Sequence, residues 1–172
     1  MKITNPIYQA ACPLIKSALS SVYKDIRRIQ LSKDTKATIN EFNTIKICGP
    51  RRCGHTTAII HIINEFFNNT TIVVHYSHRM EDFFLNVLRK EYDKSKEPYR
   101  KISNFDILLG KNKRIINGSI NNIDHLRGIG NVDAIIVDVA SLISHSKIES
   151  LVNEVVVPMA QYNPDILLIL LE

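Results

Sequence analysis

Apolar residues in this chain occur in short runs that are separated by amphipathic stretches. Runs rich in β-branched residues at 44–48, 70–76 and 132–137 are typical of buried strands. The stretches 56–68 and 80–92 instead carry apolar residues at helical spacing. Weaker patterns predict further strands at 107–109, 114–116 and 165–171, helices at 123–126 and 147–161, a turn at Asn117-Gly118 and a surface loop over 93–104.

Strands that alternate with helices predict βαβ units and a largely parallel sheet. Residues 7–31 come before this alternating region and also show helical spacing, with Pro13 expected to start or kink the helix. We therefore predict an α/β fold with three layers, α/β/α, around a mostly parallel central sheet. The expected organisation is a single domain, with an N-terminal helical segment at 1–43 and a core at 44–172.

A glycine-containing loop lies between the expected strand at 44–48 and the expected helix at 56–68. Its pattern is Gly, four residues, Gly, His and Thr, which is close to the phosphate-binding loop of P-loop proteins. The glycines allow the backbone to turn its N–H groups inward, and the helix start adds a positive dipole end. The predicted nucleotide-binding residues are Gly49, Pro50, Arg51, Arg52, Cys53, Gly54, His55, Thr56 and Thr57.

His55 occupies the position where the P-loop pattern has lysine. Histidine is shorter than lysine and mostly neutral at pH 7, so we expect phosphate binding that is weaker or pH-dependent. Arg51 or Arg52 would stabilise developing charge on the γ-phosphate as an arginine finger. The alternatives are that these arginines are only surface charge near the phosphates, and that the loop is a structural turn without a ligand.

Asp138 directly follows the apolar strand residues 134–137, which is the form of a Walker B motif. Its carboxylate is predicted to hold Mg²⁺ together with the hydroxyl of Thr56. The next residue is Val139, which cannot accept a proton from an attacking water. Glu149 and Glu172 are the other acidic candidates for that role, and slow or absent hydrolysis is the alternative.

The amino-acid composition indicates which partners, structural sites and cellular location to expect for such a domain. Lys and Arg total 22 against 17 Asp and Glu, giving a net charge of +5 that favours a polyanionic partner. Three cysteines without a Cys-x-x-Cys pair argue against a zinc site or a disulfide framework. No apolar stretch is long enough for a membrane span and no signal peptide is evident, so a cytoplasmic location is expected. His75, in an apolar strand, is predicted to be packed and hydrogen-bonded.

The sequence resembles the ATPase domain of phage terminase large subunits over residues 44–172. The resemblance lies in Pro50–Thr57, in Asn117-Gly118-Ser119, in Arg127-Gly128 and in Asp138-Val139-Ala140, where that family reads Asp-Glu-Ala. It implies a RecA-type P-loop NTPase that uses ATP and Mg²⁺ to move DNA, in the host cytoplasm if viral. It also implies Arg51 or Arg52 as the catalytic finger beside Asp138, and partners such as DNA, further copies of the chain or other packaging proteins.

The sequence is compatible with three functions. The first is an ATP-binding domain that hydrolyses ATP and acts on DNA. The second is a catalytically degenerate nucleotide-binding or assembly module, because His55 and Val139 depart from the family pattern. The third is a small nucleoside kinase, although the zinc cysteines and lid of thymidine kinases are not evident. The chain has no room for the nuclease domain of terminases, so we expect a fragment, a small relative or a degenerate copy.

Overall fold

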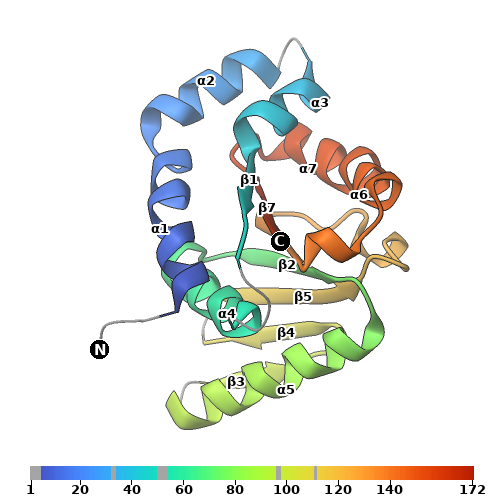
Figure 1. The fold of residues 1–172 in the computed structure, drawn as a ribbon. Helices are drawn as coiled ribbons and strands as arrows, with labels where there is room; N and C mark the ends of the chain where they lie inside the picture. Colours follow the sequence, from blue (N-terminus) through green and yellow to red (C-terminus); the bar gives the residue numbers. More distant parts are fainter. Residues whose placement is uncertain (1–4, 32–33, 50–53, 96–97, 111) are drawn as a thin grey trace.

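The structure is a computed structural model that describes residues 5–31, 34–49, 54–95, 98–110 and 112–172. Its strands form one central sheet (Figure 1). Among these residues the sheet has seven strands in the order β1-β7-β6-β2-β5-β4-β3. The strands are β1 (Thr44–Ile47), β2 (Thr70–His75), β3 (Tyr99–Lys101), β4 (Asp106–Leu109), β5 (Lys113–Ser119), β6 (Val132–Asp138) and β7 (Leu167–Leu171).

Helices connect most of these strands. The α-helices are α1 (Pro6–Ala18), α2 (Ser21–Leu31), α3 (Thr35–Thr38), α4 (His55–Phe66), α5 (His78–Ser95), α6 (His145–Leu151) and α7 (Val157–Tyr162). Short π-helical turns at Ile39–Asn43 and Val152–Val156 lead into β1 and join α6 to α7. No helix within the described ranges combines the length and the apolar content that crossing a membrane requires.

The strands β1, β7, β6, β2 and β5 run parallel, whereas β4 and β3 are antiparallel to their neighbours. Every residue of β2 and of β7 is buried. Parallel strands bury both faces because the crossover helices cover both sides of the sheet. The predicted α/β fold with a mostly parallel central sheet is therefore confirmed.

Two apolar clusters, one on each face of the sheet, make up the core. Residues from α1, α4 and α5 pack on one face, for example Ile7, Ile59 and Phe84. Residues from α6, the turn after it and α7 pack on the other face. Alternate residues of β6 divide between the two faces, since Ile136 joins the first cluster and Ile135 the second. This arrangement gives the three predicted layers.

The predicted helix at 7–31 is two helices, α1 and α2, that are interrupted at residues 19–20. Asn5 caps α1, since its side chain accepts a hydrogen bond from the Tyr8 amide, and Pro13 lies inside that helix rather than at its start. The predicted loop at 93–104 is also wrong in part. It holds the last turn of α5 and the short edge strand β3, whose residues are half-buried or exposed and give no alternating pattern.

The predicted turn at Asn117-Gly118 is wrong, because both residues lie inside β5. Tertiary contacts override the turn preference of this pair. The Asn117 side chain is fully buried and hydrogen-bonded to His75. Gly118 faces the His125 ring so closely that an added Cβ would lie 2.6 Å from His125 Nε2.

This close approach gives a stability prediction. Gly118→Ala is expected to lower the free energy of unfolding by about 1–3 kcal/mol, because overpacking forces the His125 ring from its place. Chemical denaturation of Gly118→Ala, His125→Ala and the double variant measures the effect. The double variant should lose less than the sum of the two single changes. Strict additivity would show that the ring does not limit residue 118.

Candidate nucleotide-binding site

The predicted phosphate loop joins the carboxyl end of β1 to the start of α4. Gly54 precedes α4 with a left-handed φ of 82°, a conformation that glycine adopts without strain. His55, Thr56 and Thr57 form the first turn of α4. Pro50, Arg51, Arg52 and Cys53 lie outside the described residues, so their predicted nucleotide contacts and the arginine finger stay predictions.

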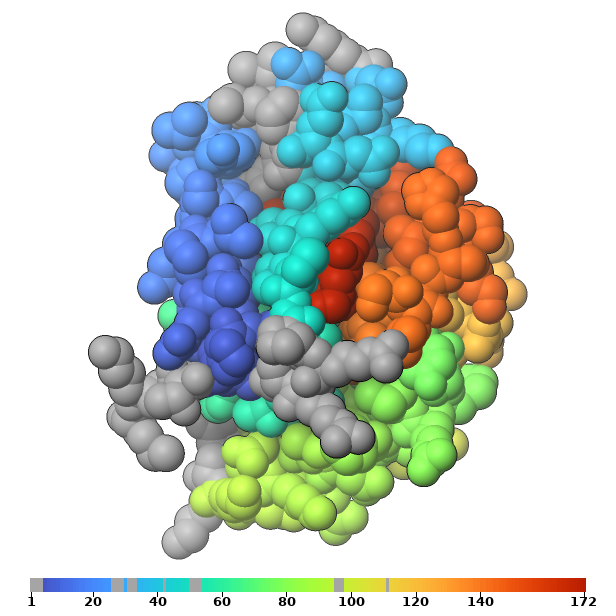
Figure 2. Space-filling view, viewed as in Figure 1, coloured from blue at the N-terminus to red at the C-terminus, as the bar shows by residue number. Residues whose placement is uncertain are grey.

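Each end of this loop is tied to another part of the fold. The Gly49 amide donates to the Glu172 carbonyl over 2.9 Å, and the Glu172 amide donates to the Ile47 carbonyl over 2.9 Å. The Gly54 carbonyl accepts from Asn5 Nδ2 over 2.9 Å. In Figure 2 the red end of β7 is visible between the cyan segment around β1 and the orange segment that follows β6. The loop therefore begins beside the end of β7, the strand that pairs with β1.

His55 and Asp138 come together at the carboxyl edge of the sheet. His55 Nδ1 lies 3.6 Å from Asp138 Oδ1, although 83 residues separate the two in the chain (138 minus 55). Thr56, the next residue of α4, is also buried. Because α4 starts over the end of β6, the structure brings His55, at the lysine position of the loop pattern, into contact with the predicted Walker B carboxylate. In doubly wound sheets this edge is where ligands bind.

Asp138 is a buried carboxylate with only 1% of its surface exposed. Burial raises the pKa of the Asp138 carboxyl, but the facing histidines, His55 and His75, outweigh burial and hold that pKa below its ordinary value. The carboxylate is therefore ionised at neutral pH. Its Oδ2 lies 3.1 Å from His75 Nδ1, whereas Oδ1 has no hydrogen-bond partner among the described residues.

Asp138 Oδ1 faces His55 Nδ1 at 3.6 Å but accepts no hydrogen bond among the described residues, and an oxygen of this kind fits a divalent cation. A buried carboxylate oxygen without a donor is costly unless a cation or a donor meets it. No group of three or more His, Cys, Asp or Glu side chains in the described part of the chain could hold a metal by itself. Mg²⁺ needs no such cage, because it takes one or two protein oxygens together with water and nucleotide phosphates. Asp138 Oδ1 offers one such oxygen, and the Thr56 hydroxyl is the second that the sequence predicts.

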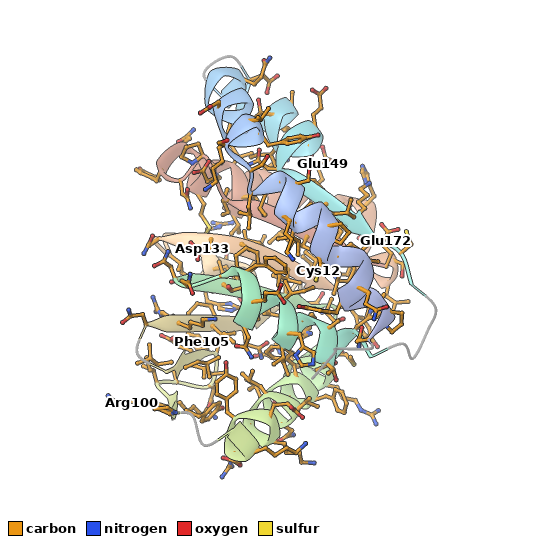
Figure 3. All side chains as sticks on the ribbon, turned by 90° about the vertical axis from the view of Figure 1, so that its left-hand side faces the viewer. Cys12, Arg100, Phe105, Asp133, Glu149 and Glu172 are labelled. Carbon is orange, nitrogen blue, oxygen red and sulfur yellow. The ribbon has the colours of Figure 1, made fainter. Side chains whose placement is uncertain are left out.

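The two glutamates that the sequence offered for activating water have different surroundings. Glu149 lies on α6 with its side chain 50% exposed, and it pairs with Lys36 over 3.0 Å. Glu172 follows β7, and its Oε2 accepts from the Cys48 thiol over 3.4 Å. That hydrogen bond is the main reason why the pKa of Cys48 is raised. Figure 3 places Glu172 at the end of the strands opposite to Asp133, and Glu149 away from both. Of these two candidates, Glu172 is the one that is hydrogen-bonded to Gly49, the described first residue of the predicted loop.

Val139, at the position after Asp138, has a left-handed φ of 54°. A β-branched residue rarely adopts this conformation, which costs on the order of 1–3 kcal/mol. The sequence pattern identified Val139 as a departure from the terminase family but not its backbone strain. The strain sits where the chain leaves β6 beside the site.

The sequence pattern did not connect His75 and Asn117 to the site. His75 Nε2 lies 2.9 Å from Asn117 Oδ1, and the ring is fully buried. The prediction that His75 is packed and hydrogen-bonded is confirmed. Its partners could not be predicted, because Asn117 and Asp138 lie 42 and 63 residues away along the chain.

A separate cavity of about 1180 Å³ opens at the opposite edge of the sheet. Asn69 and Asn131, which lie next to the amino-terminal ends of β2 and β6, line it together with Tyr162. Asp138 and the loop residues that the structure describes, Gly49 and Gly54–Thr57, do not line it. The candidate nucleotide site is therefore distinct from that cavity.

No protein-family model and no curated protein matches the sequence. Solved structures do match it. The large terminase ATPase domain of Thermus phage P74-26 superposes with a TM-score of 0.55 at 13% identity, over 78% of this chain. The fold is that of a phage large terminase ATPase domain. The large terminase of a second, thermophilic bacteriophage in complex with ADP also matches, with a TM-score of 0.53 at 12% identity, over 87% of this chain.

The terminase-like fold covers only part of those proteins. This chain matches 62% of the P74-26 ATPase domain and 37% of the ADP-bound terminase. At such low identity the likeness concerns the arrangement of helices and strands. The predicted resemblance to terminase ATPase domains is confirmed at the level of the fold.

Proposed function

We propose that this chain binds ATP with Mg²⁺ at the loop Gly49–Thr57 and at Asp138. The observation that carries the proposal is the contact between His55, in the first turn after the loop, and the buried Asp138 carboxylate, whose Oδ1 is free of hydrogen bonds among described residues. The ADP complex of a terminase with the same fold supports a nucleotide as the ligand. The proposal places the nucleotide-binding core in residues 44–172, with residues 1–43 as an N-terminal segment.

In this proposal different residues contact different parts of the bound Mg²⁺ and ATP. Amides of the loop and the start of α4 hold the phosphates. Thr56 and Asp138 hold Mg²⁺, which would neutralise charge on the phosphates when bound. Arg51 or Arg52 faces the γ-phosphate as the predicted finger. His55 lies beside both the phosphates and Asp138.

His55→Lys tests whether this residue faces phosphate. A lysine would add a permanent positive charge on a longer stem, so ATP should bind more tightly by about 1.5 kcal/mol, or roughly tenfold. Fluorescence titration with a labelled ATP analogue measures the change. His61→Lys is the matched control, because His61 lies further along α4 against the Tyr8 ring and should leave the affinity unchanged. Unchanged or weaker binding in His55→Lys would show that residue 55 does not meet phosphate.

Hydrolysis of ATP and action on DNA are a further part of the proposal. The net charge of +5 supports an anionic partner. The fold, shared with domains from DNA-packaging terminases, supports DNA as that partner. Phosphate release should rise when DNA is added, and Thr56→Ala should abolish it. A chain that binds ATP without releasing phosphate would instead be the non-catalytic binding module, for which Val139 at the position of the terminase Glu is the specific observation.

A further inference from the structure

Three polar side chains from three adjacent strands are buried side by side beneath the proposed metal site. Asn117 of β5 and His75 of β2 have no exposed surface, and Asp138 of β6 is 1% exposed. The strand register pairs His75 with both Asp138 and Ser119, two residues beyond Asn117. All three side chains therefore lie on the face of the sheet that α4 and α5 cover.

The orientation of the Asn117 amide is fixed from outside the group. Its Nδ2 donates to the Glu81 carbonyl on α5 over 3.3 Å, which leaves Oδ1 to face His75 Nε2 at 2.9 Å. The opposite amide orientation would set two carbonyl oxygens against each other. Phe84 of α5 packs against the His75 ring with centroids 5.2 Å apart. The ring is thus held at one nitrogen and against one face.

The other ring nitrogen holds Asp138. His75 Nδ1 lies 3.1 Å from Oδ2, so this oxygen is engaged in the interior of the protein. Oδ1 is turned toward His55 and has no hydrogen-bond partner among the residues that the structure describes. The two oxygens of one carboxylate therefore have different surroundings.

The location of these polar groups suggests a role beyond folding. The three preceding residues of β2, Ile72 to Val74, are apolar and completely buried, so after Thr71 the strand is apolar until it reaches the site. Buried polar groups are costly unless every partner is present, and fully paired networks hold their members in one geometry. Partners behind a metal ligand orient that ligand in this way.

We propose that His75 and Asn117 are positioning residues that fix the Asp138 carboxylate so that Oδ1 alone is presented to Mg²⁺. This inference rests on the proposed function, because it deepens the role of the same metal site. Asn117 acts through His75, and His75 acts through Asp138 Oδ2. Neither residue contacts the nucleotide.

The test compares the affinity for a fluorescent ATP analogue in Mg²⁺ with that in EDTA. His75→Phe keeps the ring and removes both nitrogens, and Asn117→Leu removes the amide that holds the ring. Each change should reduce the strengthening of binding by Mg²⁺ by about tenfold, the lower range for loss of a partner behind a metal ligand. Affinity in EDTA should stay close to that of the wild type, because the phosphate loop is unaltered.

Two comparisons separate positioning from a purely structural role. Val74→Ala, on the same strand but facing the other cluster, should lower the melting temperature without changing the Mg²⁺ effect. The double variant of His75 and Asn117 should lose no more of the Mg²⁺ effect than His75→Phe alone, since the two act in series. If His75→Phe does not fold, Asn117→Leu carries the same test.

The outcomes are distinct. A Mg²⁺ effect that survives in both single variants would overturn the inference and leave the proposed function intact. A wild-type protein that binds the ATP analogue equally in Mg²⁺ and in EDTA would also overturn it. A wild-type protein that binds no nucleotide would overturn the proposed function, and the inference with it.

Discussion

Asp138→Asn is expected to remove most of the gain in ATP affinity that Mg²⁺ provides, by at least about tenfold. Where the chain releases phosphate, the rate should fall by more than about a hundredfold, because metal catalysis supplies several kcal/mol and about 1.4 kcal/mol is a factor of ten. The asparagine keeps the shape of the side chain and an oxygen that can accept from His75. It removes the negative charge that attracts the cation. Calorimetric titration with ATP in Mg²⁺ and in EDTA measures the change in affinity.

Asp133→Asn is the matched control on the same strand. Asp133 lies at the opposite end of β6, where Oδ2 accepts from the amides of Asn68 and Asn69 over 3.0 and 2.9 Å (Figure 3). This change removes one charge from the strand as well, but far from the site. It should leave the Mg²⁺ effect unchanged. Equal Mg²⁺ effects in the two variants would mean that Asp138 is not a metal ligand.

Gly54→Ala is expected to lower both stability and ATP affinity. An alanine at φ 82° is strained, and its Cβ would lie 2.8 Å from Asn5 Nδ2, which donates to the Gly54 carbonyl. Strain of this kind costs about 1–3 kcal/mol. Because Gly54 joins the loop to α4, relief of the strain would move the loop amides away from the phosphates. We expect a loss of ATP affinity of at least about tenfold, since a small misplacement of binding groups has large effects.

Gly128→Ala provides the comparison for this effect. Gly128 also has a positive φ, 72°, but an added Cβ there would meet nothing within 4 Å. This variant carries the backbone strain without the clash and far from the loop. Denaturation should show a smaller loss of stability than in Gly54→Ala, and ATP affinity should not change. The loop would not depend on Gly54 if Gly54→Ala bound ATP as tightly as Gly128→Ala.

The core strands of the fold could be predicted because their signal is local. In β2, β6 and β7 a short apolar run is bounded by polar residues, as strands buried on both faces require. The wrong predictions fall where contacts between residues far apart in the sequence determine the local structure. Asn117-Gly118 has the composition of a turn, yet the His75 and His125 rings hold it in β5. The edge strand β3 is mostly exposed and has no apolar pattern.

Some residues of the candidate site could likewise be predicted from the sequence, and others could not. The loop glycines, Thr56 and Asp138 follow motifs of fixed order, so the pattern along the chain is enough to predict them as site residues. The partners of Asp138 follow from the strand order, which sets β2 between β6 and β5. Nothing in the residues around His75 indicates that order. The motif pattern therefore predicts the residues that would contact the ligand. It does not predict the residues that hold those side chains in position.

Calorimetric titration of the wild-type chain with ATP, in Mg²⁺ and in EDTA, tests the central claim most directly. The claim is that the loop after β1 and the Asp138 carboxylate together form a site for a nucleotide and its metal. We predict one ATP bound per chain, with tighter binding in Mg²⁺ and a matching rise in melting temperature, since a ligand stabilises the state that binds it. An absence of both heat and thermal stabilisation at saturating ATP and Mg²⁺ would contradict the claim.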